Sequence, residues 1–423
     1  MPQLSDDCFA FGGRLMTTAE ALDRIAEVVT PVTGTEDLGL RAACGRILAE
    51  DVIAGLDVPG HDNSAVDGYA VYFADLDPKA ETRLPVTGRI AAGHPLGRPA
   101  RRGEALRIFT GAVMPEGPDT VMMQEDCREE DGPAGERQVI VAPGIRRGSN
   151  RRAQAEDVRA GDVILRRGHR LRPQDVGLAA AVGSTALAVY RPLRVAVFST
   201  GDELCEPGAE LPPGAIFDSN RYTLAALLEA QGCAVTDLGI LPDRLDAVRD
   251  ALDAAAAEHD MVFTSGGVSV GEEDHVKAAV EALGSLHFWR LAIRPGRPLA
   301  LGQIGTVPFV GLPGNPVAVM VTFLRIARPL VLGLAGCTDI APTLYRVTAG
   351  FDYKKKANRR EWLRVRLVTQ GDGGLAAEKF PRDGAGILSS LVDADGLVEL
   401  PEDMTQLTTG TMVDFLPFNE VGR

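Results

Sequence analysis

The chain has 423 residues, of which 44 are Lys or Arg and 58 are Asp or Glu, so its net charge is −14 at pH 7. At roughly 100–200 residues per domain, this length predicts two to four domains. Hydrophobic residues make up 45% and charged residues 24%, which is typical of a soluble globular protein and excludes a wholly disordered chain. The acidic balance argues against nucleic acid or an anionic membrane as the main partner, because both require a basic face.

The chain carries no sign of export or membrane insertion. Its N-terminus lacks the basic region and apolar stretch of a secretory signal, and six scattered cysteines form no Cys-x-x-Cys pair. The longest apolar run, from Val317 to Leu334, is interrupted by Arg325, Arg328 and Pro329, so we expect no membrane span. We therefore expect a cytoplasmic protein with reduced cysteines and no structural zinc.

The predicted secondary structure changes twice in the first half of the chain. Residues 17–30 predict an amphipathic helix that begins with a Thr17–Glu20 capping box. Residues 58–147 contain short β-type runs separated by Gly/Pro turns, which predicts a small all-β module. This module interrupts a helical and linker region made of residues 1–57 and 148–190, whose Arg-rich stretch is either a solvated connector or an anion contact.

The second half is more regular. Between residues 191 and 338, apolar strands expected at 195–198, near 235, and at 261–263, 286–293 and 307–311 alternate with amphipathic helices. This alternation predicts βαβ units and a parallel sheet covered on both faces. Residues 339–423 are again β-like and predict a separate small β domain. The fold class is thus multidomain α/β plus β.

Gly-rich loops follow three of the predicted strands. They comprise residues 199–203, 265–274 and 312–316. Glycine lets the backbone approach a ligand and aim N–H groups at it, and the next helix adds its positive end. Because the carboxyl ends of parallel strands share one edge of a sheet, these loops favour a phosphate-bearing ligand there.

More familiar motifs do not explain these loops. The chain contains neither G-x-x-x-x-G-K-[ST] nor a G-x-G-x-x-G after a strand, which argues against P-loop and dinucleotide sites. Residues 267–271 match G-x-S-x-G, in which Ser269 would be a hydrolase nucleophile, but the triad then needs a later, well-separated His. His275 and His287 are the only later histidines and both lie within eighteen residues of Ser269, so a hydrolase is disfavoured.

Charged residues near the loops suit metal and oxyanion binding. Asp67, Asp243 and Asp274 lie beside glycines or at strand ends, with Glu203 on a neighbouring loop, and such carboxylates commonly bridge Mg²⁺ to phosphate. For each acid alone, a solvated loop or helix-cap role is the alternative. In the predicted strand, a period of two puts Arg290 and Arg294 on one face, roughly 13 Å apart. Together with Arg297 they would hold an oxyanion, unless they only line an exposed strand face.

Four long motifs in a fixed order resemble the molybdopterin molybdenumtransferase family, which shares its catalytic fold with the C-terminal part of gephyrin. The motifs are residues 57–70 (DVPGHDNSAVDGYA), 198–204 (FSTGDEL), 265–271 (SGGVSVG) with Asp274, and 311–316 (GLPGNP). The resemblance runs from about Thr17 to Phe418. It implies an enzyme that inserts molybdenum from molybdate into the dithiolene of adenylylated molybdopterin, with Mg²⁺-dependent hydrolysis releasing AMP.

The resemblance also implies an elongated homodimer, with the site between the α/β domain of one subunit and the β module of the other. Asp67, Asp243, Asp274 and Glu203 would be catalytic, and the three aspartates would hold Mg²⁺. With the Gly-rich loops included, the substrate-binding residues would be Thr110, Ser199, Thr200, Gly201, Ser265, Gly266, Gly267, Ser269, Gly271, Arg290, Arg294, Arg297, Pro313, Gly314, Asn315, Arg359 and Ser390.

The sequence departs from the family at two places. Positions 290, 294 and 297 are Arg where lysine is frequent, and the stretch before Glu156 and Asp157 lacks the usual glycine. The alternatives are a molybdopterin adenylyltransferase-like enzyme and a non-catalytic, gephyrin-like scaffold; retention of the loop aspartates favours the transferase. The sequence leaves open the choice of molybdenum or tungsten, and whether an adenylyltransferase or target molybdoenzymes dock on the chain.

Overall fold

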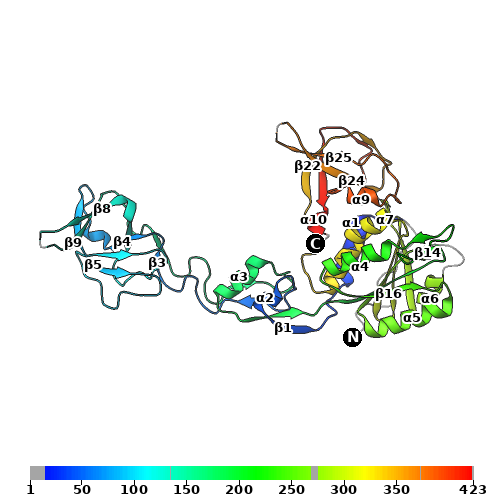
Figure 1. Ribbon diagram of the computed structural model, residues 1–423, viewed down its shortest axis with the longest axis horizontal. Helices are drawn as coiled ribbons and strands as arrows, with labels where there is room; N and C mark the ends of the chain where they lie inside the picture. Colours follow the sequence, from blue (N-terminus) through cyan, green and yellow to red (C-terminus); the bar gives the residue numbers. More distant parts are fainter. Residues whose placement is uncertain (1–14, 134, 268–274, 372, 422–423) are drawn as a thin grey trace.

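The computed structural model describes residues 15–133, 135–267, 275–371 and 373–421, without the side chains of Val28 and Phe288. The chain is elongated: a β module lies at one end, a narrow middle part follows, and an α/β domain and a β barrel lie at the other end (Figure 1). This arrangement confirms the predicted multidomain α/β plus β fold class.

The first helix begins where the capping box predicts. Helix α1 (Thr18–Val28) has Thr17 as its N-cap: the Glu20 N–H donates to Thr17 Oγ1 at 3.2 Å, and the Thr17 N–H donates to Glu20 Oε2 at 2.9 Å. Ala21 and Ile25 are fully buried. The helix packs against α8 (Arg328–Leu334) of the α/β domain, and its Ala26 lines a pocket together with Arg167 and Tyr190 of the middle part.

The middle part is built from short antiparallel strand pairs and two helices. Its strands pair as β1 (Thr35–Gly39) with β12 (Ala186–Tyr190) and β2 (Val52–Ile53) with β11 (Val163–Leu165); its helices are α2 (Leu40–Ala43) and α3 (Pro173–Ala181). A further pair, β3 (Asn63–Ser64) with β10 (Arg151–Arg152), lies where the chain enters and leaves the β module. Strands this short show no periodicity, which is why the sequence predicted only helix and linker here.

The β module is a six-stranded sheet, as its all-β texture predicts. In spatial order its strands are β7 (Thr120–Met123), β4 (Gly68–Val71), β6 (Ala105–Ile108), β5 (Thr82–Ile90), β9 (Arg137–Val141) and β8 (Cys127–Asp131). Alternate residues feed two apolar clusters: Tyr69 and Val71 belong to one, whereas Ala70 belongs to the other. The module therefore has its own core.

The α/β domain has a sheet in which the first four strands, in spatial order, are parallel. The strands are β16 (Ala234–Leu241), β13 (Arg194–Thr200), β17 (Met261–Ser265), β21 (Val307–Leu312), β20 (Pro298–Ile304) and β18 (Gly284–Arg290). Helix α4 (Asn220–Ala230) and the helical segment from Pro316 cover one face; α5 (Leu245–Glu258) and α6 (His275–Leu283) cover the other.

Two details of this domain correct the sequence-based prediction. Strands β20 and β18 run antiparallel to their neighbours, so the sheet is mixed, and β20 was not predicted. The strand predicted over 286–293 ends at Arg290; Ile293 and Arg294 form β19, which pairs with the barrel instead. Arg290 and Arg294 therefore lie in two different sheets, not on one face of one strand.

The apolar run near residue 320 is a core helix. Residues Pro316–Leu334 form a continuous helical segment of α7 (Pro316–Thr322), a π-helical turn (Phe323–Ala327) and α8. Its length of 19 residues and mean hydropathy of 1.8 would suffice to cross a membrane, but 89% of it is buried inside the protein. Packing against the sheet accounts for its apolar character.

The C-terminal domain is a closed five-stranded barrel. Its strands follow the order β24 (Arg360–Thr369), β25 (Leu375–Lys379), β22 (Tyr345–Ala349), β28 (Met412–Pro417) and β26 (Gly396–Leu400), and β26 pairs back with β24. Short pieces complete it: β23 (Tyr353–Lys354), β27 (Gln406–Leu407), α9 (Ser389–Val392) and α10 (Phe418–Val421).

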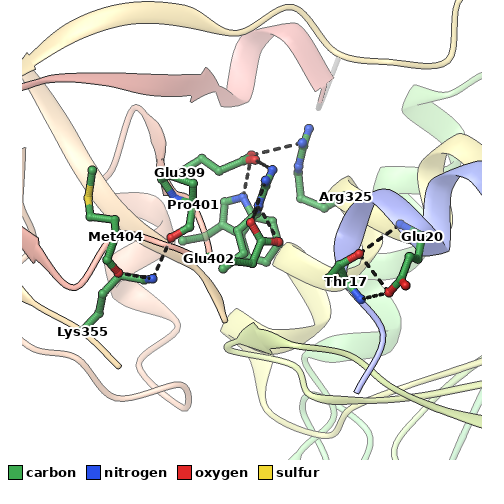
Figure 2. A network of polar contacts seen from close by, with 10 residues as sticks. Thr17, Glu20, Arg325, Lys355, Glu399, Pro401, Glu402 and Met404 are labelled. Atoms are coloured by element: carbon green, nitrogen blue, oxygen red, sulfur yellow. Dashed lines mark hydrogen bonds and ion pairs between the residues drawn. The ribbon is translucent and has the colours of Figure 1, made fainter. Parts of the chain in front are cut away.

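A buried ionic network joins the barrel to the core helix (Figure 2). Glu399 of β26 forms ion pairs with Arg325 of the π-helical turn, at 3.1 Å, and with Arg360. The indole N–H of Trp362 also donates to Glu399, at 2.9 Å. Arg325 and Glu399 are 7% and 4% exposed, so this contact holds the barrel against the α/β domain in a place that water hardly reaches.

Candidate functional site

The carboxyl ends of the four parallel strands meet at one edge of the α/β sheet. Three neighbouring loops contact one another there. The Gly266 N–H donates to the Leu312 carbonyl at 3.0 Å, and an Asn220 side-chain N–H donates to the Gly314 carbonyl at 2.7 Å. The loops after β17 and β21 and the start of α4 thus form one surface, as the strand topology predicts.

Two glycines in these loops are required by geometry. Gly267 has φ of +64°, and a Cβ there would lie 2.7 Å from Thr200 Cγ2. Gly201 has φ of +147°, and a Cβ there would lie 2.6 Å from Glu203 Oε2. No side chain fits either position without displacing its neighbour, so the backbone of both loops stays uncovered toward the sheet edge.

Polar side chains at the same edge are only partly satisfied. Thr200 Oγ1 lies 3.4 Å from Asp243 Oδ1, which links the loops after β13 and β16. The Ser199 hydroxyl is buried without a hydrogen-bond partner among the described residues, and the exposed Glu203 lies on the β13 loop. Of the predicted loop residues, Ser269, Gly271 and Asp274 lie outside the described residues.

Two adjoining cavities open beside this edge. One, of about 380 Å³, is lined by Gly266, Gly267 and the Pro313–Asn315 loop. The other, of about 510 Å³, lies between the α/β domain and the barrel. Pro295, Gly296 and Ala385 line both, so the two cavities share a wall. The larger one is walled by three cations, Arg294, Arg364 and Lys379, and two carboxylates, Glu361 and Asp383.

A fully buried carboxylate organises the cationic wall. Glu361 is 0% exposed; its Oε1 accepts from Arg359 at 2.6 Å, and its Oε2 accepts from the Tyr353 hydroxyl at 2.9 Å. Arg294 contacts the same Oε2 at 3.5 Å. Burial, followed by the hydrogen bond to Glu361, raises the pKa of Tyr353 to about 12, so this hydroxyl stays a donor. The carboxylate thereby fixes the positions of Arg294 and Arg359.

Arg364 is the least satisfied cation in the larger cavity. It is 6% exposed, one NH2 group donates to the Arg382 carbonyl at 2.8 Å, and its Nε has no partner among the described residues. Burial lowers its pKa, with Asp383 opposing and Arg294 adding to that effect. Lys379, in contrast, pairs with Asp383 at 2.6 Å. An anion in this cavity would find an Arg364 guanidinium with unused hydrogen-bonding capacity.

Asp67 lies in the β module, at the other end of the molecule from Asp243 (Figure 1). The backbone N–H and the hydroxyl of Thr110 both donate to Asp67 Oδ1 at 2.8 Å. These two hydrogen bonds lower the pKa of Asp67, so its carboxylate is ionised. One chain therefore does not bring Asp67 and Asp243 together, and the described residues contain no cluster of three or more metal-ligating side chains.

The remaining predicted residues do not line the larger cavity. Arg290 and Arg297 are exposed and line neither cavity, and Arg359 pairs with the buried Glu361. Ser390 is fully buried in α9, where its hydroxyl donates to the Ile387 carbonyl, and it lines neither cavity. Sequence reasoning missed Arg364, Tyr353 and Lys379. The alternation Arg360–Trp362–Arg364 along a strand was the only available signal, and it does not show which residues face the cavity.

Comparison with known families matches nearly the whole chain in three consecutive segments. Residues 16–183 match the MoeA N-terminal region (domain I and II), residues 196–333 a probable molybdopterin binding domain, and residues 346–418 the MoeA C-terminal region (domain IV). The first segment contains Asp67, the second the Gly-rich loops, and the third most of the wall of the larger cavity.

Individual relatives match at full length. The chain is 38% identical over 409 residues to a molybdopterin molybdenumtransferase of Haemophilus influenzae, covering 96% of this chain and 100% of the relative. It is 36% identical over 407 residues to the corresponding protein of a Nostoc species, with 93% and 91% covered. A solved structure of the molybdopterin biosynthesis MoeA protein from Pyrococcus horikoshii OT3 has a TM-score of 0.80 at 28% identity and covers 96% of this chain and 100% of its own.

Proposed function

The chain belongs to the molybdopterin molybdenumtransferase family and is an enzyme of molybdenum cofactor biosynthesis; we propose that it inserts molybdenum from molybdate into adenylylated molybdopterin, with Mg²⁺-dependent hydrolysis that releases AMP. One observation carries this proposal: a Gly-lined cavity suited to phosphate shares a wall with a cation-walled cavity suited to an oxyanion. A reaction between a nucleotide-linked pterin and molybdate needs both in contact. The cysteines are scattered along the sequence, which is compatible with a substrate that supplies its own sulfur ligands. We propose that the protein acts in the cytoplasm.

The chain's residues divide the binding work between the two cavities. The uncovered backbone of the loops at Gly201, Gly267 and Gly314 would donate N–H groups to the phosphates. Arg364 and Arg294 would hold molybdate, because a guanidinium fork suits bidentate contact with an oxyanion. Glu361 keeps the Arg294 guanidinium in place before molybdate arrives.

The carboxylates suit Mg²⁺ by their chemistry. Asp67 is ionised, and only its Oδ1 is engaged by Thr110, which leaves Oδ2 for a ligand. Asp67 and Asp243, with Asp274 outside the described residues, would hold the ion, and a bound Mg²⁺ would supply Lewis-acid stabilisation to the phosphate oxygens. At the end of β13, the Thr200 hydroxyl contacts Asp243, and the exposed Glu203 follows three residues later; these two groups would orient water.

Because Asp67 and Asp243 are far apart in one chain, we propose a homodimer in which each site takes Asp67 from one subunit and Asp243 from the other. Mixing inactive Asp67→Asn and Asp243→Asn proteins tests this. After random exchange about half of the dimers are mixed, and each of those has one intact site of two, so about a quarter of normal activity should return. If the mixture stays inactive after exchange, the shared site is refuted.

The direct test is AMP release from adenylylated molybdopterin by the purified protein with Mg²⁺, with and without molybdate. We expect release that molybdate stimulates and that Asp243→Asn abolishes. Arg364→Met should raise the molybdate concentration needed for half-maximal stimulation. If the wild-type protein binds the substrate tightly but releases no AMP, the transferase proposal fails and a scaffold role replaces it.

A further inference from the structure

Beside Asp67, the β module carries a stack of side chains with no assigned role. Arg89 and Arg107 lie opposite each other on the parallel strands β5 and β6. Their guanidinium carbons lie 4.6 and 4.8 Å from the centre of the Phe109 ring. Both guanidinium groups are within cation–π distance of the same phenyl ring, which restrains them beside it.

The two arginines differ in what else they contact. Arg107 lies over the Tyr69 ring and donates two hydrogen bonds, to the Gly68 carbonyl at 3.2 Å and to Gln124 Oε1 at 2.5 Å, so its position is set by the β module itself. Arg89 is exposed and, among the residues that the structure describes, has no carboxylate partner and no hydrogen-bond acceptor.

This stack is attached to the Asp67 loop. Phe109 immediately precedes Thr110, which donates both of its hydrogen bonds to Asp67. The Phe109 N–H donates to the Ile90 carbonyl at 3.1 Å, which ties the end of β5, and with it Arg89, to the same edge. The Arg89 guanidinium is thus linked to Asp67 through Phe109 and Thr110.

We propose that Arg89 is a substrate-binding residue, whose guanidinium, held on the Phe109 ring, binds a phosphate group of the nucleotide-linked substrate at the Asp67 edge. This inference rests on the proposed function. Because Arg89 belongs to the β module, it would bind the phosphate from the side opposite the Gly-rich loops. A stacked guanidinium loses little freedom on binding, and its free N–H edge suits two oxygens of one phosphate.

The test compares Arg89→Ala with Arg83→Ala in the full dimeric protein. Arg83 lies on the same strand β5, is also exposed and has no partner among the described residues, so it matches Arg89 in charge and setting. Losing one charge-assisted contact should raise the KM for adenylylated molybdopterin about tenfold or more, with kcat and the melting temperature little changed. Arg83→Ala should leave KM unchanged.

Equilibrium binding of AMP, measured by calorimetry, separates this inference from the proposed function, because it needs no turnover. We expect Arg89→Ala to weaken AMP binding by a similar factor. Unchanged KM and AMP affinity in Arg89→Ala, with an active wild-type enzyme, overturns the inference alone. A weaker dimer at unchanged AMP affinity also overturns it, because Arg89 would then pair with a carboxylate of the second copy.

Discussion

Replacing Glu361 with Gln tests whether one buried carboxylate organises the oxyanion cavity. Its two oxygens accept hydrogen bonds from Arg359, at 2.6 Å, and from Tyr353, at 2.9 Å, and Arg294 lies at 3.5 Å. A glutamine has one accepting oxygen, so its NH2 group must face either Arg359, which can only donate, or the Tyr353 hydroxyl, which would then have to accept instead of donate. In either orientation the change removes the negative charge that pairs with Arg359 and Arg294.

The magnitude follows from burial. Removing one partner of a fully buried ion pair costs about 3–5 kcal/mol. Arg359 and Arg294 are 19% and 44% exposed, so water compensates part of that loss. We therefore expect Glu361→Gln to lower the free energy of unfolding by about 2–3 kcal/mol, near the value of a single charged hydrogen bond.

Urea unfolding followed by tryptophan fluorescence measures this effect, because the buried Trp362 adjoins Glu361. The matched control is Glu378→Gln, an exposed carboxylate of the same barrel with no ion-pair partner among the described residues. A double-mutant cycle with Arg359→Gln should give a coupling of about 1 kcal/mol or more. If Glu361→Gln and Glu378→Gln have equal effects, Glu361 does not organise the cavity.

Three further predictions concern the loops and the β module. Gly267→Ala and Gly305→Ala both place alanine at positive φ, which should lower the free energy of unfolding by about 1–2 kcal/mol in each variant. Only Gly267→Ala should also reduce AMP release, because the new Cβ would meet Thr200. Equal activities of the two variants would contradict this. Hydrogen bonds from Arg98 and Thr87 lower the pKa of Glu104 from its ordinary value of 4.5 to about 2. The stability of the β module should therefore fall as the pH drops from about 4.5 to about 2, and thermal melts of Glu104→Gln should lack this acid dependence. Thr110→Val removes one hydrogen bond that lowers the pKa of Asp67, so the acid limb of the pH–rate profile should move to higher pH; an unmoved limb would exclude Asp67 as its source.

Local signals were predictable from the sequence. The Thr17–Glu20 capping box involves residues three apart, and its hydrogen bonds form as expected. The strand at 194–200 alternates between the two covered faces, with Val195 and Val197 in one apolar cluster and Ala196 and Phe198 in the other. In both cases the determining contacts are close in sequence or follow a fixed period.

The junction between the α/β domain and the barrel was not predictable in the same way. A period of two assumes that a strand continues, whereas β18 ends at Arg290 and the chain joins a second sheet at Ile293. That change is imposed by pairing with β24, about seventy residues later in the chain. It also determines that Arg294 faces Glu361 and the larger cavity, whereas Arg290 does not line that cavity.

The composition of the candidate site was also not predictable from local sequence. Short sequence motifs indicate which residues can take part in chemistry. Examples are the Asp67 carboxylate, which Thr110 holds, and the loop with glycines at positive φ. Which of them act together depends on contacts between domains, as Arg325 and Glu399 show for the barrel. For Asp67 it depends on a second copy of the chain, if the proposed dimer holds. In that dimer the β module is complete as a fold, with its own core, and is still half of a site, which would account for the absence of a partner for Arg89 among the described residues.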